Sequence, residues 1–411
     1  MYSLQDLQMQ PQSAFRVVAT LQDLIASEED AIYWVDPPDN TKKGFLQDVG
    51  SGAYIYKLHN AIFYPDRALQ APFGEEIPKE FSIAVGDLRF RHDGAGLLLT
   101  GSRALFSESF GRNKLIHYTL SGDGLATSLA AGLPKIENEV DQTSFFCEFF
   151  TSHFGHALID MLGRFWPTAL PCADDFTKMQ FVGAGWIGFR NGQVNNGPKF
   201  FQEIVSACGI SQADLLCITK TTKFSELYVP SRIAPFFNQS GPKYNDLMQM
   251  IAQRVSADAQ GNQSDRVFLS RSRLPLGKRS LDGETERFIE DFFARNGFEI
   301  VHPQELSLVE QIGKVRHAKR LAGLVGSQMH LAVFSNAVSP KMFRIRPKFH
   351  PVFWDIPILH SLGGSLHDFV AEDFGVPNEN DRPNQPKNRS WNISTDDLTR
   401  LEDEFKRWIA Q

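Results

Sequence analysis

Apolar runs and amphipathic stretches alternate along residues 266–334 of this chain. Arg266–Arg271 is a short apolar run that leads into a polar loop, which is typical of a strand buried in a parallel sheet. Phe298–His302 and Leu321–Val325 repeat this pattern, and an amphipathic stretch over Glu284–Asn296 separates the first two runs. The order of these runs predicts a mononucleotide-binding α/β unit.

Residues that favour helix ends mark the boundaries within this unit. Gly297 follows the first helix, where a left-handed cap favours glycine. Ser307 and Glu310 have the spacing of a capping box at the start of the next helix. After the third strand, Gly326 and Ser327 predict a sharp turn into a helix from about residue 328, and the free N–H groups and dipole at its start suit a phosphate.

The remaining chain divides into regions of different pattern. The first 140 residues carry short alternating runs, such as Ala53–Leu58 and Gly96–Thr100, which predict a β-rich region without a readable motif. From Phe145 the pattern is again α/β. The small polar residues of Ser256–Asp265 predict an interdomain linker, because a chain of 411 residues usually forms two domains.

We therefore expect an N-terminal, acceptor-side domain over residues 1–255, β-rich over 1–140 and α/β over 141–255. A Rossmann-like nucleotide-binding domain is expected over 256–375. Residues 376–411 are expected to form a linker and a final helix.

Composition narrows the classes of partner and compartment. The net charge of −6 and the pI near 6.0 argue against nucleic acid as the main partner. The four cysteines have no Cys-x-x-Cys spacing, so we expect reduced, packed thiols. The N-terminus lacks the pattern of a signal peptide and no apolar run reaches 18 residues, which predicts a soluble, cytoplasmic protein.

Two histidines and a carboxylate stand close together in the segment 151–164. In a helix capped by Ser152, the side chains of His153, His156, Asp160 and Arg164 would share one narrow stripe opposite an apolar face. A solvated helix face is one interpretation. A catalytic site is the other, because imidazoles exchange protons near neutral pH and a carboxylate can orient them.

Positive charge gathers after the first strand of the nucleotide-binding unit. Arg271, Lys278 and Arg279 lie at or beyond the carboxyl end of this strand, where open α/β sheets bind ligands, and they would neutralise a diphosphate. A surface pair near a flexible loop is the alternative. His302, Gln304 and Glu305 follow the second strand and are candidates for contact with a nucleotide base, although nothing in them selects one.

Five motifs follow one another in a fixed order: Phe154-Gly-His156-x-x-x-Asp160, a strand ending in Arg271, Arg279-x-x-Asp282-x-Glu284, Ser307-x-x-Glu310-Gln311, and Ala322-Gly-x-x-Gly326-x-x-x-His330. As an ordered set over about residues 145–346 they resemble glycosyltransferase family 61, which includes bacterial capsular-polysaccharide-type proteins and eukaryotic β-xylosyl- and N-acetylglucosaminyl-transferases. Two places depart from the family pattern. His153 stands where an asparagine is common, and residues 327–330 replace a His-Gly-Ala-Gly-type turn.

The resemblance implies an α/β, GT-B architecture with two Rossmann-like domains facing a cleft. It also implies inverting transfer from a nucleotide-diphosphate sugar, with a UDP-sugar favoured, to a glycan or glycolipid acceptor in surface or capsular polysaccharide synthesis. No cofactor is required, a divalent metal is not implied, and peripheral membrane association would come through the acceptor. The expected donor-binding residues are Arg271, Arg279, Lys278, Gln304, Gly326, Ser327, Gln328 and His330.

Inversion requires a general base on the acceptor side. His156 with Asp160 is the expected pair, and His153 is a second candidate. A metal-dependent hydrolase is an alternative from another class, because these three side chains have the spacing of metal ligands. A non-catalytic nucleotide- or glycan-binding protein is a third.

The final helix carries an apolar stripe, formed by Leu398, Leu401, Phe405, Trp408 and Ile409. Ser394 is its expected N-cap. In GT-B enzymes the last helix commonly crosses back, so we expect this one to dock on the N-terminal domain. Packing on its own domain, or against another copy of the chain, is the alternative.

Overall fold

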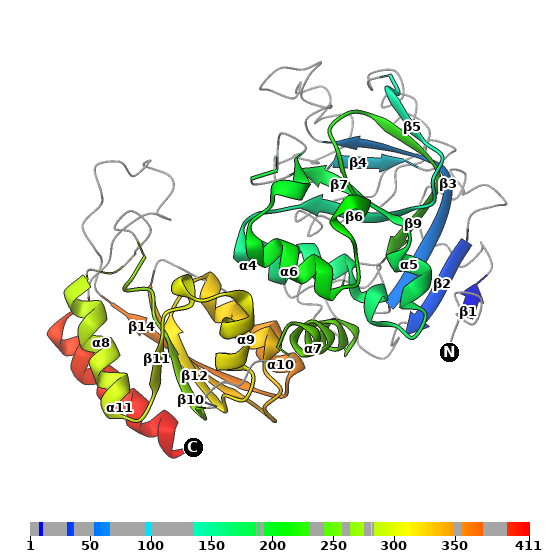
Figure 1. Cartoon of the computed structure of the whole chain (residues 1–411). Helices are drawn as coiled ribbons and strands as arrows, with labels where there is room; N and C mark the ends of the chain where they lie inside the picture. The colour runs from blue at the N-terminus through cyan, green and yellow to red at the C-terminus, as the bar shows by residue number, and fades with distance from the viewer. Residues whose placement is uncertain are drawn as a thin grey trace, which may run out of the picture. The chain divides into compact units, whose positions relative to one another are not determined.

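The computed structural model describes residues 8–10, 31–36, 53–65, 96–99, 135–185, 188–189, 193–230, 233, 242–256, 264–274, 281, 283–348, 355–372 and 393–411. The chain divides into two units, Met1–Leu247 and Met248–Gln411, and each is described by itself (Figure 1). The division falls inside helix α7 (Pro242–Ser256). The predicted linker begins where this helix ends, and its residues 257–263 lie outside the described residues.

Five parallel strands form the sheet of the C-terminal unit: β10 (Arg266–Leu269), β11 (Glu299–Val301), β12 (Arg320–Leu324), β13 (Lys341–Pro347) and β14 (Ser365–Ala371). Their order in the sheet is β11-β10-β12-β13-β14, each neighbouring pair running parallel. This is the doubly wound order 2-1-3-4-5. The α/β unit predicted from the hydrophobic pattern is therefore confirmed.

Helices cover both faces of this sheet, as parallel strands require. They are α8 (Gly283–Arg295), α9 (Leu308–Val315), α10 (Asp355–Ser361) and α11 (Thr395–Ala410), with the 3-10 helices η9 (Pro303–Glu305) and η10 (Ser327–Phe334). Figure 1 shows α8 and α11 on one face of the sheet and α9 and α10 on the other. Gly297 has the left-handed φ of 79° that was predicted for the end of α8.

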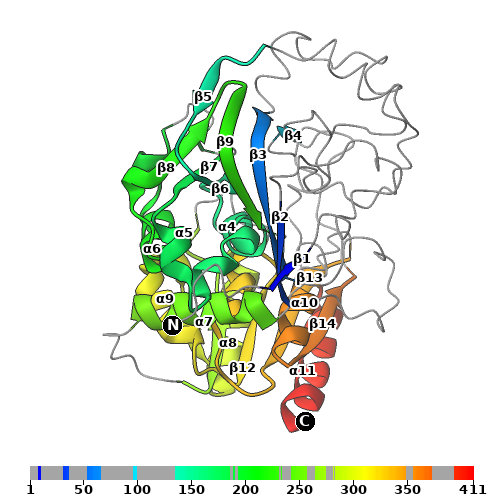
Figure 2. The ribbon, with the colours of Figure 1, turned by 90° about the vertical axis from the view of Figure 1, so that its right-hand side faces the viewer.

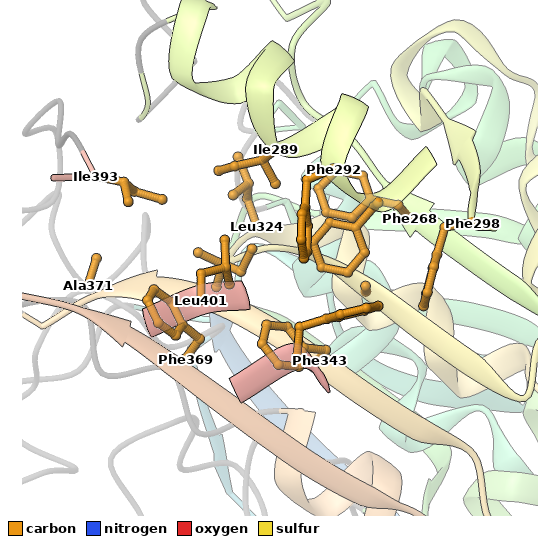
Figure 3. Packing of buried hydrophobic residues seen from close by; sticks show 14 of the residues in the cluster. Phe268, Ile289, Phe292, Phe298, Leu324, Phe343, Phe369, Ala371, Ile393 and Leu401 are labelled. Atoms are coloured by element: carbon orange, nitrogen blue, oxygen red, sulfur yellow. The ribbon is translucent and has the colours of Figure 1, made fainter. Parts of the chain in front are cut away.

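The apolar stripe of α11 packs into the core of the C-terminal unit (Figure 3). All five of its predicted members contribute: Leu398, Leu401, Phe405, Trp408 and Ile409. The ring of Phe405 meets that of Phe293 edge to face, with centroids 5.2 Å apart. Since the stripe is used within this unit, the prediction that the helix returns to the N-terminal domain is wrong. Ser394 caps the helix as predicted, accepting a hydrogen bond from the Asp397 N–H at 3.0 Å.

The predicted capping box at the start of α9 is present. The Glu310 N–H donates to Ser307 Oγ at 3.3 Å, and the Ser307 N–H donates to Glu310 Oε2 at 2.8 Å. We expect Ser307→Ala to lower the free energy of unfolding by about 1 kcal/mol, because it removes the N-cap acceptor. Urea denaturation of the full chain measures this, and Ser307→Thr, which keeps a hydroxyl, is the control. Equal stability of the alanine and threonine variants would contradict the prediction.

A mixed sheet forms the centre of the N-terminal unit. Its strands are β1 (Gln8–Gln10), β2 (Ala31–Asp36), β3 (Ala53–Pro65), β4 (Gly96–Leu99), β5 (Asn138–Val140), β6 (Ser144–Phe150), β7 (Gln180–Gly185), β8 (Leu215–Ile218) and β9 (Thr222–Pro230). The main order is β1-β2-β3-β9-β6-β7-β8, and Figure 2 shows β3 and β9 side by side. Strands of the predicted β-rich region and of the α/β region thus share one sheet, antiparallel at β3–β9 and parallel over β9-β6-β7-β8.

Short helices accompany the parallel strands of this unit: α4 (Phe154–Ile159), α5 (Ala173–Thr177), α6 (Lys199–Ala207), and the 3-10 helices η4 (Met161–Arg164), η5 (Trp166–Ala169), η6 (Val194–Asn196) and η7 (Gln212–Asp214). The phenylalanine run of β6 is buried throughout, so these rings are core. Among the described residues of both units, no helix combines the length and apolar character needed to span a bilayer.

Candidate functional site

The carboxyl ends of β10 and β12 mark the switch point of the C-terminal sheet. The two strands are neighbours, but the chain leaves β10 towards β11 on one side and continues from β12 towards β13 on the other. Ligands of open α/β sheets bind outside such a point. Arg271 follows β10 and Gly326 follows β12, so two of the predicted donor-binding residues come together there.

Arg271 is held at both its backbone and its side chain. Its N–H donates to Glu286 Oε1 at 2.9 Å, and its Nη1 donates to the Val325 carbonyl at 2.8 Å. Burial lowers the pKa of the Arg271 guanidinium, and the Glu286 carboxylate opposes this shift. Arginine remains cationic at neutral pH, so a positive charge is fixed against the turn that follows β12.

The turn at Gly326 is shaped by its lack of a side chain. Gly326 has a φ of 156°, and a Cβ there would lie 3.1 Å from Arg271 Cζ and closer still to Nη1. The Met329 N–H donates to the Gly326 carbonyl at 3.0 Å and closes the first turn of η10. This i to i+3 bond makes the predicted helix a 3-10 helix, which begins at Ser327. The N–H groups of Ser327 and Gln328 precede the first intrahelical bond.

Gly326→Ala is expected to weaken binding of a nucleoside diphosphate by roughly tenfold, because a strained backbone costs about 1–3 kcal/mol and the new Cβ displaces Arg271. Isothermal titration calorimetry measures the affinity. Gly297→Ala is the matched control, since it also places a Cβ at positive φ, 79°, but away from this turn. Equal affinity of the Gly326 variant and the wild-type chain would show that the turn does not shape the binding site.

The other predicted donor residues are placed as follows. Ser327 and Gln328 are half-buried at the start of η10, and Gln328 Nε2 donates to the Leu324 carbonyl at 2.5 Å. Gln304 is exposed in η9, directly after β11. His330 is buried and bonds to Asp355. Lys278 and Arg279 lie outside the described residues, and so does Asp282 of the family motif.

A second set of polar groups lies at the carboxyl ends of β10 and β11. Ser270 Oγ bonds to Glu290 and accepts the Ser272 N–H at 3.0 Å, while His302 Nδ1 lies 4.0 Å from Glu290 Oε1. Burial lowers the pKa of His302, with Glu290 acting in the opposite direction. Together with Glu286, these contacts tie the start of the Arg271 loop to α8.

In the N-terminal unit, the two histidines follow the carboxyl end of β6. His153 is the N-cap of α4, and its Nδ1 accepts the His156 N–H at 3.4 Å. The two rings lie with centroids 4.6 Å apart. His156 Nδ1 is 4.0 Å from Asp160 Oδ2, and the His156 side chain keeps 23% of its exposure whereas that of Asp160 is buried. The residue pair predicted as a base and its carboxylate is thus in proximity.

The predicted single helical stripe is not formed. α4 has six residues and ends at Ile159; its C-cap Asp160, with a φ of −139°, leaves the helical region, and η4 follows. Ser152 is not the N-cap, and Arg164 is buried rather than on a solvated face. Its Nε donates to Glu148 Oε2 at 2.7 Å, so this arginine ties η4 to β6. The backbone of Glu148 has a positive φ of 70°, at an irregularity in the β6–β7 pairing.

Tyr244, at the start of α7, forms a hydrogen bond with the last turn of α4, the helix that carries His156. Its hydroxyl donates to the Leu158 carbonyl at 2.7 Å, which satisfies one of the carbonyls that the end of α4 leaves without an intrahelical partner. Burial raises the pKa of Tyr244 well above its usual value, and Asp160 adds to the shift. Tyr244 therefore donates as a neutral phenol.

The described residues contain no group of three or more His, Cys, Asp or Glu side chains arranged to hold a metal ion. Of the three side chains considered as metal ligands, His153 accepts the His156 N–H through its Nδ1. Asp160 is buried at the C-cap of α4. The metal-dependent hydrolase is therefore not favoured.

Several residues of the site could not be read from the sequence. Glu286 and Glu290 look like ordinary exposed acids of an amphipathic helix, yet both bond to the Arg271 loop. Asp355 lies beyond the motifs altogether. One signal was present: Arg344 and Arg346 interrupt an apolar run that forms a buried strand, β13, and charges at such positions need partners.

Comparison with known protein families gives one match, which covers these groups. A search of curated proteins found no match. Residues 154–341 match the family model described as Glycosyltransferase 61. The match includes His156, Asp160, Arg271 and the Gly326 turn, and it confirms the resemblance drawn from the ordered motifs: over this segment the chain is similar to glycosyltransferase family 61.

Proposed function

We propose that this glycosyltransferase is an inverting enzyme that moves a sugar from a nucleotide-diphosphate donor, favoured as a UDP-sugar, to a glycan or glycolipid acceptor of surface or capsular polysaccharide. The single observation that carries the proposal is the placement of Arg271 against the Gly326 turn, at the switch point of a parallel sheet. A GT-B arrangement of the two units and a cytoplasmic location belong to the proposal.

The donor half of the reaction is assigned to the C-terminal unit. When the bond between the anomeric carbon and the phosphate oxygen breaks, its electron pair and negative charge pass to the diphosphate. Arg271, together with Lys278 and Arg279 further along the sequence, would neutralise that charge, and hydrogen bonds from the first N–H groups of η10 would stabilise it further. Such contacts strengthen as charge grows, so they favour the transition state over bound substrate.

The acceptor half is assigned to His156. An acceptor hydroxyl attacks the anomeric carbon from the face opposite the diphosphate, which inverts the configuration, and its proton passes to the imidazole. Asp160, 4.0 Å from His156 Nδ1, would stabilise the resulting imidazolium. His153 remains the second candidate, because its ring lies beside that of His156.

A calorimetric screen of nucleotide sugars against the full chain tests this function, followed by NMR of the sugar product. Binding of one UDP-sugar and transfer with inverted anomeric configuration would support it. Donor binding without transfer to any acceptor, and without slow donor hydrolysis, would favour the non-catalytic alternative. Retention of configuration would contradict the assignment of a single displacement. Stoichiometric zinc in the purified protein would favour the alternative of a metal-dependent hydrolase.

A further inference from the structure

A chain of alternating charges lies on one face of the C-terminal sheet, with Asp355 and Arg344 buried and Asp368 and Arg346 half-buried. Along β13, Phe343 and Ile345 point into the aromatic core shared with α8 and α11 (Figure 3). Because successive strand residues face opposite sides, Arg344 and Arg346 point to the other face, which η10 and α10 cover. Charges on that face must therefore find partners inside the protein.

Each charge in the chain bonds to the next. Asp355 Oδ1 bonds to His330 Nδ1 at 2.9 Å, and Asp355 Oδ2 accepts from Arg344 Nη1 at 2.7 Å. Arg344 Nε donates to Asp368 Oδ1 at 2.9 Å, and Arg346 Nε donates to Asp368 Oδ2 at 2.5 Å. Four elements, η10, α10, β13 and β14, each contribute at least one member.

Stability alone does not explain this network. Asp355 and Arg344 are each 1% exposed, and replacing buried ion pairs by packed apolar residues is often neutral or stabilising. Burial by itself would raise the pKa of Asp355, but His330 and Arg344 outweigh it and hold that pKa below its usual value. Asp355 is therefore a carboxylate, and a carboxylate only accepts hydrogen bonds.

The contact with Asp355 fixes how His330 presents its ring. Since Asp355 only accepts, the proton lies on His330 Nδ1. His330 Nε2 makes no hydrogen bond to any residue that the structure describes. In a 3-10 helix, residues three apart lie on the same side, so His330 stands about 6 Å along the axis from Ser327, the first residue after the Gly326 turn.

The charges of this network balance one another in pairs. Among the described residues, Asp355 from α10 forms the ion pair with the ring, and Arg344, Asp368 and Arg346 continue the series of ion pairs behind it. Two carboxylates and two guanidiniums cancel while the imidazole is neutral. An imidazolium adds one uncompensated positive charge, which a phosphate at the turn would balance.

We propose that Asp355, clamped by Arg344, is a positioning residue that holds His330 with Nδ1–H towards the carboxylate, so that Nε2 takes a proton from solvent when the donor binds and then donates a hydrogen bond to the leaving diphosphate. The proposal rests on the proposed function for the identity of the anion. When the anomeric C–O bond breaks, the phosphate oxygen that receives the electron pair would accept the Nε2–H hydrogen bond. Asp355 lies outside the segment matched by the family model.

Asp355→Asn tests this, because an amide cannot satisfy both neighbours in the same way. Arg344 only donates, so the amide oxygen must face Arg344 and the NH₂ must face His330. His330 Nδ1 then becomes an acceptor, and the proton moves to Nε2. If His330 became an imidazolium in this variant, it would have no carboxylate at Asp355 to pair with. We expect kcat to fall roughly 10- to 100-fold, the range for partners that orient a histidine through its second nitrogen, with a much smaller change in donor KM.

The ¹⁵N shifts of His330 provide a readout that structural damage alone would not produce. Without ligand, we expect the Nδ1–H tautomer in the wild-type chain and the Nε2–H tautomer in Asp355→Asn. Adding UDP should protonate both ring nitrogens in the wild-type chain and leave Nδ1 unprotonated in the variant. The wild-type spectra test the proposal even if the variant fails to fold.

Glu404→Gln is the matched control, since Glu404 Oε2 bonds to His367 Nε2 at 2.9 Å in a second histidine–carboxylate pair of the same unit. It should leave kcat and the His330 shifts unchanged. An Nε2–H tautomer in the wild-type chain, or UDP that binds without shifting the His330 nitrogens, would overturn the inference while the proposed function stands. Failure of the wild-type chain to bind UDP or transfer sugar would contradict the proposed function, while the ligand-free tautomers still decide the role of Asp355.

Discussion

His156→Ala is expected to lower sugar transfer by about 10²–10⁴-fold, the contribution typical of a general base, while donor affinity stays close to that of the wild-type chain. The physical reason is that the imidazole would accept a proton from the acceptor hydroxyl and makes no assigned contact with the nucleotide. Asp160 is buried 4.0 Å away, so the substitution also leaves a carboxylate without its nearest imidazole. Single-turnover kinetics with the identified donor measure the rate, and calorimetry measures the affinity.

Two variants separate the base from its surroundings. His153→Ala removes the N-cap acceptor of α4, which costs about 1 kcal/mol of stability, but keeps His156. If His156 is the base, this variant should lose far less activity. His59→Ala removes a histidine of β3, a strand of the same unit that contributes none of the predicted site residues, and it should leave the transfer rate unchanged. Loss of donor binding in parallel with transfer would move His156 to the donor side, and greater loss from His153→Ala would make that residue the base.

Local chemistry explains why much of the C-terminal unit was predictable. The capping box at Ser307, the left-handed cap at Gly297 and the N-cap at Ser394 depend on residues within a few positions of each other. The same holds for the alternation of short apolar strands with amphipathic helices. Sequence reasoning failed where partners are distant in the chain. The stripe of α11 was correctly read as apolar, yet its period says nothing about which surface receives it.

The candidate site residues show the same difference between local signals, which the sequence reveals, and distant partners, which it does not. Arg271 was found because a cation at the end of a parallel strand has a local signature. The contacts that fix it, from Glu286 and from the Val325 carbonyl, join residues 15 and 54 positions apart and have none. The helix from His153 to Arg164 was extrapolated as continuous, but Asp160 leaves the helical region, and Arg164 bonds to Glu148 in β6 instead of facing solvent. Tertiary hydrogen bonds outweighed helical periodicity there.

Arg271→Ala is expected to lower kcat by about 10²–10³-fold, as for loss of one donor to the charge that develops in a transition state, and to weaken donor binding as well. The kcat of Arg271→Lys should fall between those of the alanine variant and the wild-type chain. Lysine keeps the charge but not the planar fork, in which one nitrogen bonds to the Val325 carbonyl and others would bond to a phosphate. Both variants are compared by steady-state kinetics and by calorimetry with the nucleoside diphosphate.

The matched control is Arg273→Ala, two residues further along the same loop. Its side chain is 55% exposed and pairs with Glu305, and exposed ion pairs contribute little to stability. It removes the same formal charge from the same segment. A purely long-range electrostatic effect would therefore weaken donor binding equally in both variants, and salt would screen it. A specific contact predicts a large loss for Arg271→Ala, partial recovery with lysine, and near wild-type behaviour for Arg273→Ala. Equal, salt-sensitive losses at both positions would instead mean that the loop attracts the donor without touching the leaving phosphate.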